Sequence, residues 1–599
     1  MSALAYPPLN RAESEIRVLA LGPGFLGEPI VCKLDTVSLG SFIEYEALSY
    51  TWGETTLCRE IVVNGSPVSI SENAFVALMH LRNENSVRRV WIDAICINQL
   101  NDSERAHQVK MMKDIYQRST RVLVWLGPAR RESDSGLDLL VDLCRKTSLA
   151  SQNRTGVPTQ NFQELPVAPL RALMDLLRRP YWRRVWIIQE TAVATLEPLI
   201  GCGQRWLSWN TWKNGLIHIY AYDTSGESRN FTEDIDLDHE MILPDLGLCN
   251  RFFDLDWIRA VTGHKRGDKK LEPRNLQEIL HFSRGRESLD PRDRIYAVLG
   301  LIRSSENLCP LELIDVDYSK SLRHIYSEVA NFALRTEKNL DILFFRNHLR
   351  HAHFPSWLPD FSSTSNKYPS LKPKQLNIWS ASRHTMSEPP WAPDRSPKLS
   401  DDFSALLVSG RLVDTIDRVL DLRGIRTDPL AIFHQIRLFA LPNTQKTNET
   451  TNLFYVEEAL WRTLLGNLDL HGRVPSPSAF RHAFTKLLYQ ELSQLPDHSA
   501  DASQVNKFLL ATTFTISHSN VMPHRRLFIT RTGRFGLGPP DCESEDIVSL
   551  LWSYSMPTIL RSSATSHEFV GNAYVHGMMN GEDVPSSIDD LDWINLEIQ

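Results

Sequence analysis

Arg183-Arg184-Val185-Trp186-Ile187-Ile188-Gln189-Glu190 is a short, mainly apolar run that ends in a carboxylate. Two other aromatic stretches precede it, Tyr45 to Glu54 (YEALSYTWGE) and Val90 to Gln99 (VWIDAICINQ). In all three, apolar residues lead directly into a polar cluster. This pattern is typical of a buried element whose end delivers side chains to a cleft.

Glu190 is the most informative residue of the three stretches. It follows apolar residues, where a carboxylate is costly to bury unless it has a partner or a task. We therefore treat Glu190 as the leading candidate for a functional side chain.

Strands and helices are expected to alternate from Glu44 to about Trp209. Asn64-Gly65 favours a tight hairpin turn, and Pro180 suits the first position of a helix running from Tyr181 to Ala194. Ser71 is expected to cap one helix, and Asp102 or Ser103 another. Alternating strands and helices predict an α/β domain of three layers, in which helices cover both faces of a parallel sheet. The expected strands are Tyr45–Tyr50, Arg89–Ile95, Arg121–Leu126 and Leu199–Gly203.

The rest of the chain gives weaker signals. Asp290-Pro291 is expected to open a helix that Gly300 can end. Leu527 to Met578 alternates short apolar runs with turns, which predicts a small antiparallel sheet or barrel. We divide the chain into an N-terminal extension (1–43), the α/β domain (44–210), a mainly helical region (211–361), a linker (362–400), a mixed α/β region with helices at Phe454–Leu468 and Ser478–Leu492 (401–520), and a β-rich module (521–599).

Composition narrows the class of protein. The 599 residues are 42% hydrophobic and 23% charged, as in ordinary globular proteins, and their net charge of −7 gives no electrostatic case for nucleic acid. No apolar run reaches the ~18 residues that cross a bilayer, and no Cys/His spacing resembles a metal site. The eight cysteines are scattered, which suits reduced thiols in a cytosolic or nuclear compartment.

The three stretches resemble the three blocks of the fungal heterokaryon incompatibility (HET) domain: Glu46 to Gly53, Trp91 to Gln99 and Trp186 to Glu190. The resemblance covers about residues 44 to 205. Asp290 to Tyr296 and Tyr574 to Gly577 also look typical of long HET-domain proteins. The family implies non-self recognition and regulated cell death when unlike hyphae fuse, with protein partners and self-association.

The HET domain is in turn similar to Toll/interleukin-1 receptor (TIR) domains, which are flavodoxin-like and some of which cleave NAD with a glutamate. Trp186 to Glu190 fits the Trp-x-x-x-Glu setting of that glutamate, and Ser49 to Glu54 resembles the loop after the first strand. The likeness implies NAD as a substrate rather than a bound cofactor, with Glu190 as the catalytic carboxylate. Further candidate substrate-binding residues are Ser49, Trp52, Gly53, Asp93, Arg183 (or Arg184, at the pyrophosphate) and Trp186.

Each candidate has a plainer interpretation. Glu190 could be a solvated helix residue or the partner of a nearby arginine, and the tryptophans suit core packing. Asp93 could cap a turn or a helix. The alternative to an enzyme is a non-enzymatic module that signals through assembly with a partner. Fold analogy alone does not decide between these functions.

Overall fold

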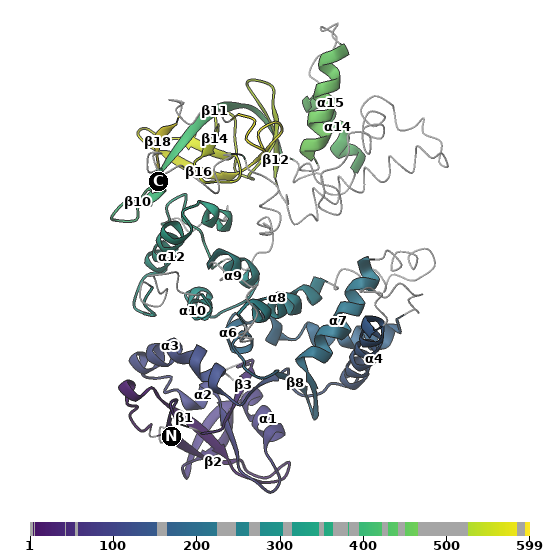
Figure 1. Cartoon of the computed structure of the whole chain (residues 1–599), viewed down its shortest axis with the longest axis vertical. Coiled ribbons are helices and arrows are strands. Elements are labelled where there is room, and N and C mark those ends of the chain that lie inside the picture. The colour runs from purple at the N-terminus through teal and green to yellow at the C-terminus, as the bar shows by residue number, and fades with distance from the viewer. Residues whose placement is uncertain are drawn as a thin grey trace. The chain divides into compact units, whose positions relative to one another are not determined.

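The computed structural model forms two compact units, residues 1–320 and 321–599 (Figure 1). The residues it describes are 4, 6–41, 43–53, 58–152, 165–224, 247–262, 276–302, 314–346, 353–362, 381, 395–421, 429–440, 450–464, 525–583 and 593–599.

The first unit contains a mixed sheet of nine strands in the order β5-β4-β2-β1-β6-β3-β7-β8-β9. Its centre, β6-β3-β7-β8, is parallel, whereas β1, β5 and β9 run antiparallel to their neighbours. The α/β class is thus confirmed, although the sheet is mixed: β2 and β4 also pair in parallel, and the other pairs outside the centre are antiparallel. The strands are β1 Glu15–Leu21, β2 Val31–Ser38, β3 Glu46–Tyr50, β4 Cys58–Val63, β5 Ser66–Ser71, β6 Arg88–Trp91, β7 Arg121–Trp125, β8 Leu199–Cys202 and β9 Arg205–Ser208.

The stretch expected as an N-terminal extension, 1–43, supplies β1 and β2 to this sheet. Asn64 and Gly65 have φ angles of 52° and 79°, as the predicted hairpin turn between β4 and β5 requires. The Ser71 hydroxyl accepts a hydrogen bond from the Ala74 amide at 3.3 Å and caps the following helix, as the sequence predicted.

Helices surround the sheet and continue to residue 299. Figure 1 shows α1 and α3 on opposite sides of the sheet. The chain runs from β3 through α1 to β6, and then in the opposite direction, past β3, through α3 to β7. Because crossovers between parallel strands are right-handed, α1 and α3 must lie on opposite faces of the sheet. The helical elements are η1 Arg11–Glu13, α1 Glu72–Leu81, α2 Asp93–Cys96, α3 Asp102–Arg118, α4 Ser133–Gln152, α5 Val167–Leu177, η2 Pro180–Arg183, α6 Ile187–Ala192, α7 Trp209–Thr224, α8 Gly247–Thr262, α9 Leu276–Ser283 and α10 Asp293–Leu299.

Two elements differ from the prediction: one strand is shorter than expected, and one helix is divided in two. The strand expected over Arg89–Ile95 ends at Trp91, and Asp93 begins α2, a helix of one turn. The helix expected over Tyr181–Ala194 is divided: η2 begins at Pro180 as predicted, but the backbone of Arg184 is extended (ψ 138°) before α6 begins at Ile187. An apolar run does not reveal such breaks, because its hydrophobicity continues across them.

The cap of α3 also differs from the prediction. Asn101, rather than Asp102 or Ser103, accepts a hydrogen bond from the Glu104 amide at 3.0 Å through its side chain.

An N-cap interaction contributes about 1 kcal/mol. Asn101→Ala should therefore lower the free energy of unfolding by about that amount. Asp102→Ala changes the adjacent, exposed residue and should lower the free energy of unfolding by less than half as much. Urea titrations of both variants measure the two losses, and equal losses would contradict Asn101 as the cap.

The second unit contains a closed ring of five strands. β11 pairs with β14 and with β18, and β14-β15-β16-β18 completes the ring. The second half of β11 also pairs with β12, from which β13 and β17 extend. The expected β-rich C-terminal module is thus present, and β11 enters it from far upstream in the sequence. Its strands are β11 Leu406–Asp421, β12 Arg526–Thr530, β13 Phe535–Gly538, β14 Ile547–Leu551, β15 Thr558–Ser562, β16 His567–Asn572, β17 Tyr574–Val575 and β18 Ile594–Ile598.

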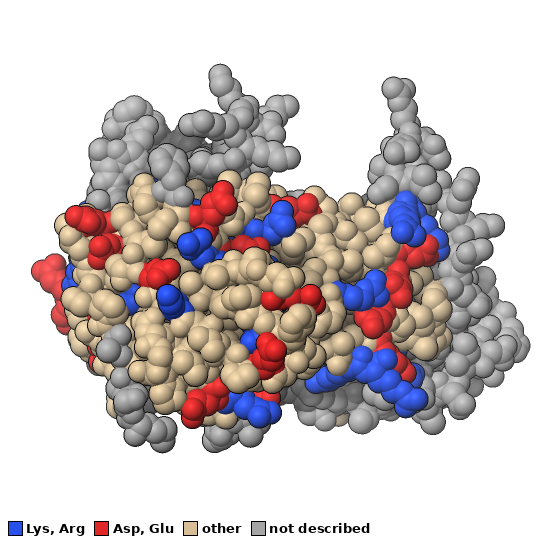
Figure 2. All heavy atoms as spheres, turned by 90° about the horizontal axis from the view of Figure 1, so that it is seen from below, with Lys and Arg blue, Asp and Glu red and all other residues tan. Residues whose placement is uncertain are grey.

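The remaining elements of this unit are α12 Leu322–Glu337, η5 Asp341–Phe345, β10 Lys398–Leu399, α14 Pro429–Ala440 and α15 Thr450–Leu464. The helix expected at 478–492, and most of the linker expected at 362–400, lie outside the described residues. Within the described part of the chain, no helix has the length and apolar character needed to cross a bilayer. On the face drawn in Figure 2, basic and acidic side chains are interspersed.

Candidate functional site

The three aromatic stretches meet at the carboxyl ends of two neighbouring parallel strands. Ser49 and Tyr50 end β3, Asp93 follows β6, and Glu190 lies on α6. The chain passes from β3 to β6 in one direction along the sheet and from β7 to β8 in the other, so the topological switch point lies at β3, between β3 and β7. In open α/β sheets, ligands bind in the crevice outside the strand ends at such a point.

Glu190 is buried, with only 1% of its surface exposed. The Ser49 hydroxyl donates a hydrogen bond to its Oε2, and the same hydroxyl lies 2.8 Å from the Tyr181 hydroxyl. Glu190 Oε1 lies 3.9 Å from Nη1 of Arg184. Burial raises the pKa of Glu190 to about 7, although Arg184 and the Ser49 hydrogen bond lower it. Glu190 is thus an acid held inside the domain, and it is not a solvated helix residue.

Asp93 is half-buried and lies close enough to Arg184 to interact with its charge. Its Oδ2 accepts a hydrogen bond from the Trp52 indole at 2.8 Å, and its Oδ1 accepts one from the Ala94 amide at 2.7 Å. Burial raises the pKa of Asp93, while Arg184 and these hydrogen bonds oppose the shift. Trp52 and Asp93 are each half-buried, and their contact joins the loop after β3 to the start of α2. They form the outer part of the site.

Arg184 connects the two carboxylates. Its side chain is 18% exposed and donates a hydrogen bond to the Tyr50 carbonyl. Burial lowers the pKa of the Arg184 guanidinium, and the negative charges of Glu190 and Asp93 raise it. The net shift of the pKa is upward, because the raising effects outweigh burial. Ser49, Asp93, Arg184 and Glu190 are called the acid–arginine cluster below.

The neighbouring Arg183 does not join this cluster. Its side chain is 46% exposed and lies 3.8 Å from Glu287. Of the two arginines that the sequence offered for an anionic ligand, the structure places Arg184 beside Asp93 and Glu190. Nothing in the sequence separates the two, because only the extended backbone at Arg184 determines which one points inward.

Gly53 and Trp186 lie at the edges of the site. Gly53 is exposed with φ +77°, a conformation that favours glycine, and a Cβ there would lie 3.4 Å from that of Asn73. Trp186 is half-buried and donates a hydrogen bond to Asp293. Burial raises the pKa of Asp293 to about 6, against the hydrogen bonds from Tyr318 and Trp186.

The segment from Glu287 to Asp293 therefore belongs to the surroundings of the site. The Val185 amide donates to the Glu287 carbonyl at 2.9 Å, and the Tyr318 hydroxyl donates to Asp293 at 2.7 Å. The sequence predicted Asp290 as a helix cap. Its carboxylate instead accepts hydrogen bonds from the backbone and guanidinium of Arg292, and α10 begins at Asp293. Among the residues described, no group of three or more His, Cys, Asp or Glu side chains could hold a metal ion.

Fold and site together define a class of protein: an α/β domain with a closed acid–arginine cluster at its switch point, joined to a C-terminal β-barrel unit. Comparison with known families agrees with this division. Residues 45–190 match the heterokaryon incompatibility protein (HET) family, and residues 497–587 match the Het-6 β-barrel domain. Residues 45–190 of this chain thus form a HET domain.

The chain is similar along nearly its whole length to heterokaryon incompatibility protein 6, OR allele, of Neurospora crassa. The two are 23% identical over 668 residues, covering 96% of this chain and 95% of the relative. No solved structure matches the chain. The likeness of the HET domain to TIR domains therefore stays a prediction.

Proposed function

We propose that this protein acts in fungal non-self recognition and that its HET domain triggers the response, regulated cell death. The matches to the HET and Het-6 barrel families, and the similarity to a heterokaryon incompatibility protein, support this role. The structural observation that carries the proposal is the convergence of all three HET blocks on one acid–arginine cluster.

The closed geometry of the cluster favours signalling through conformation and assembly. Glu190 is 1% exposed and accepts the Ser49 hydrogen bond, so it meets an external ligand only after the cluster opens. Removing the partner of a buried charge is costly, and Glu190 is buried beside the Arg184 guanidinium. A partner that separates Arg184 from the carboxylates would therefore change the conformation of the domain.

NAD hydrolysis is the second candidate function. It is favoured by the position of the cluster at a switch point and by the half-buried Trp52 and Asp93 outside it. Cleavage of the nicotinamide–ribose bond passes through a ribose cation, which one carboxylate can stabilise, and nicotinamide leaves as a neutral molecule without a general acid. Glu190 would take this role once Ser49 released it.

Nicotinamide release and cell killing together distinguish the two candidates. Purified full-length protein is incubated with NAD, with and without a fused domain that forces clustering, and wild type is compared with Glu190→Gln. Glu287→Gln, which changes an exposed carboxylate, is the matched control. If NAD hydrolysis operates, clustered wild type releases nicotinamide at least ~100-fold faster than Glu190→Gln.

Under the signalling proposal, overexpressed wild type and Glu190→Gln both kill fungal cells, and neither releases nicotinamide above the uncatalysed rate. If wild type neither kills cells on overexpression nor alters the viability of fusions between unlike strains, the proposed role in incompatibility is wrong. Killing that requires Glu190, together with nicotinamide release, would replace the signalling mechanism with the enzymatic one.

A further inference from the structure

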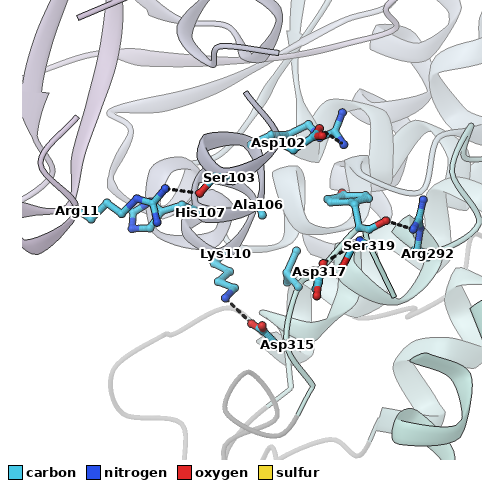
Figure 3. A pocket seen from close by; sticks show the side chains of 13 residues that line it. Arg11, Asp102, Ser103, Ala106, His107, Lys110, Arg292, Asp315, Asp317 and Ser319 are labelled. Carbon is cyan, nitrogen blue, oxygen red and sulfur yellow. Dashed lines mark hydrogen bonds and ion pairs between the residues drawn. The ribbon is translucent and has the colours of Figure 1, made fainter. Parts of the chain in front are cut away.

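A hollow of about 480 Å³ opens on the first unit, and none of the residues of the acid–arginine cluster lines it. Three segments that are far apart in the sequence form it: η1, the first half of α3, and residues 315–319 together with Arg292. Figure 3 shows their side chains converging on it. Its volume is that of a small-molecule site.

Basic side chains follow one wall of this hollow. Ser103, His107 and Lys110 occupy positions i, i+4 and i+7 of α3 and therefore share one face of the helix. The Arg11 guanidinium donates a hydrogen bond to the Ser103 hydroxyl at 2.6 Å, which places a third basic group beside His107 and Lys110 (Figure 3). Three basic groups thus lie in a row. Arg11, His107 and Lys110 are called the basic row below.

Arg11 and Lys110 repel a positive charge on His107. Burial lowers the pKa of His107, and Arg11 and Lys110 lower it further, whereas only Glu104 on the same helix raises it. Arg11 donates to a neutral hydroxyl, so this hydrogen bond does not neutralise its charge. An anion placed among the three groups would relieve this repulsion.

The acidic residues of the hollow are already engaged. Asp315 pairs with Lys110, Asp102 lies 3.0 Å from Arg105, and Asp317 accepts the Ser319 amide at 2.8 Å. The Asp315–Lys110 pair is exposed on both sides, at 56% and 42%, and exposed pairs contribute little. A phosphate group can therefore displace Asp315 from Lys110 at low cost.

We propose that this hollow binds a small phosphate-bearing molecule, whose phosphate lies on the basic row of Arg11, His107 and Lys110. Phosphate oxygens accept charge-assisted hydrogen bonds from all three side chains. The volume of the hollow can hold a molecule of the size of a metabolite or a nucleotide.

Inorganic pyrophosphate tests this proposal by calorimetric titration of the full-length protein. Wild type should bind it in a saturable manner, and Lys110→Gln should weaken binding about tenfold through loss of one charge-assisted contact. Lys146→Gln is the matched control, because Lys146 is a lysine of the same unit, 46% exposed, and paired with Asp142 on its own helix. It should bind like wild type.

Asp315→Asn gives the decisive result, because it removes the competing carboxylate and leaves the basic row unchanged. Its affinity for pyrophosphate should rise, an outcome that general damage to the fold does not produce. The proposal is overturned if pyrophosphate shows no saturable binding, if Lys110→Gln and Lys146→Gln bind equally, or if Asp315→Asn binds no more tightly than wild type.

Discussion

Arg184→Met is expected to lower the free energy of unfolding of the HET domain by roughly 3 kcal/mol at pH 8, since breaking a buried ion pair leaves charges without a partner. Arg184 lies beside two carboxylates, those of Glu190 and Asp93, and also donates to the Tyr50 carbonyl. Methionine has similar length but no charge and no donor. The measurement is a urea titration of the full-length protein, with hydrogen exchange of peptides from α6 locating the loss.

The adjacent arginine provides the control. Arg183 is 46% exposed and lies 3.8 Å from Glu287, so Arg183→Met should change stability by less than about 0.5 kcal/mol. The two variants make the same chemical change one residue apart. Equal losses would mean that the acid–arginine cluster does not support the domain, and the structural argument for the site would fail.

Much of this site could be predicted from sequence, because each HET block is an apolar run that ends in polar residues. That pattern gave β3 nearly to the residue, and it offered Ser49, Asp93 and Glu190 as candidates, which the fold brings to one edge of the sheet. The physical reason is that parallel strands bring their carboxyl ends together, so the residues that follow them meet.

The interior of the site could not be predicted in the same way. The alternation of apolar and polar residues shows where Glu190 lies along the chain, but it does not show that Ser49 and Tyr181 close over it. The choice of Arg184 over Arg183 depends on one extended residue between η2 and α6. The link from Trp186 to Asp293 joins residues more than a hundred positions apart, and local patterns carry no information about such contacts.

The pH dependence of stability is expected to differ strongly between wild type and Glu190→Gln. The pKa of Glu190 is about 7 in the folded domain, against 4.5 for the free side chain. Between these values the folded protein holds a proton that the unfolded chain has lost, so the stability of wild type falls as the pH rises from 4.5 to 7. A shift of this size corresponds to about 3 kcal/mol.

Glutamine is neutral throughout and can still accept the Ser49 hydrogen bond, so Glu190→Gln lacks this decline. The variant should therefore gain stability relative to wild type as the pH rises from 4.5 to 8, measured by urea titrations at each pH. Asp93 and Asp293, whose pKa values are also raised, remain in both proteins and give them a shared decline that cancels in the difference. Glu287→Gln, which changes an exposed acid, should follow wild type. If the curves of wild type and Glu190→Gln stay parallel over this range, Glu190 titrates in the folded domain as it does in the unfolded chain, and burial does not raise its pKa.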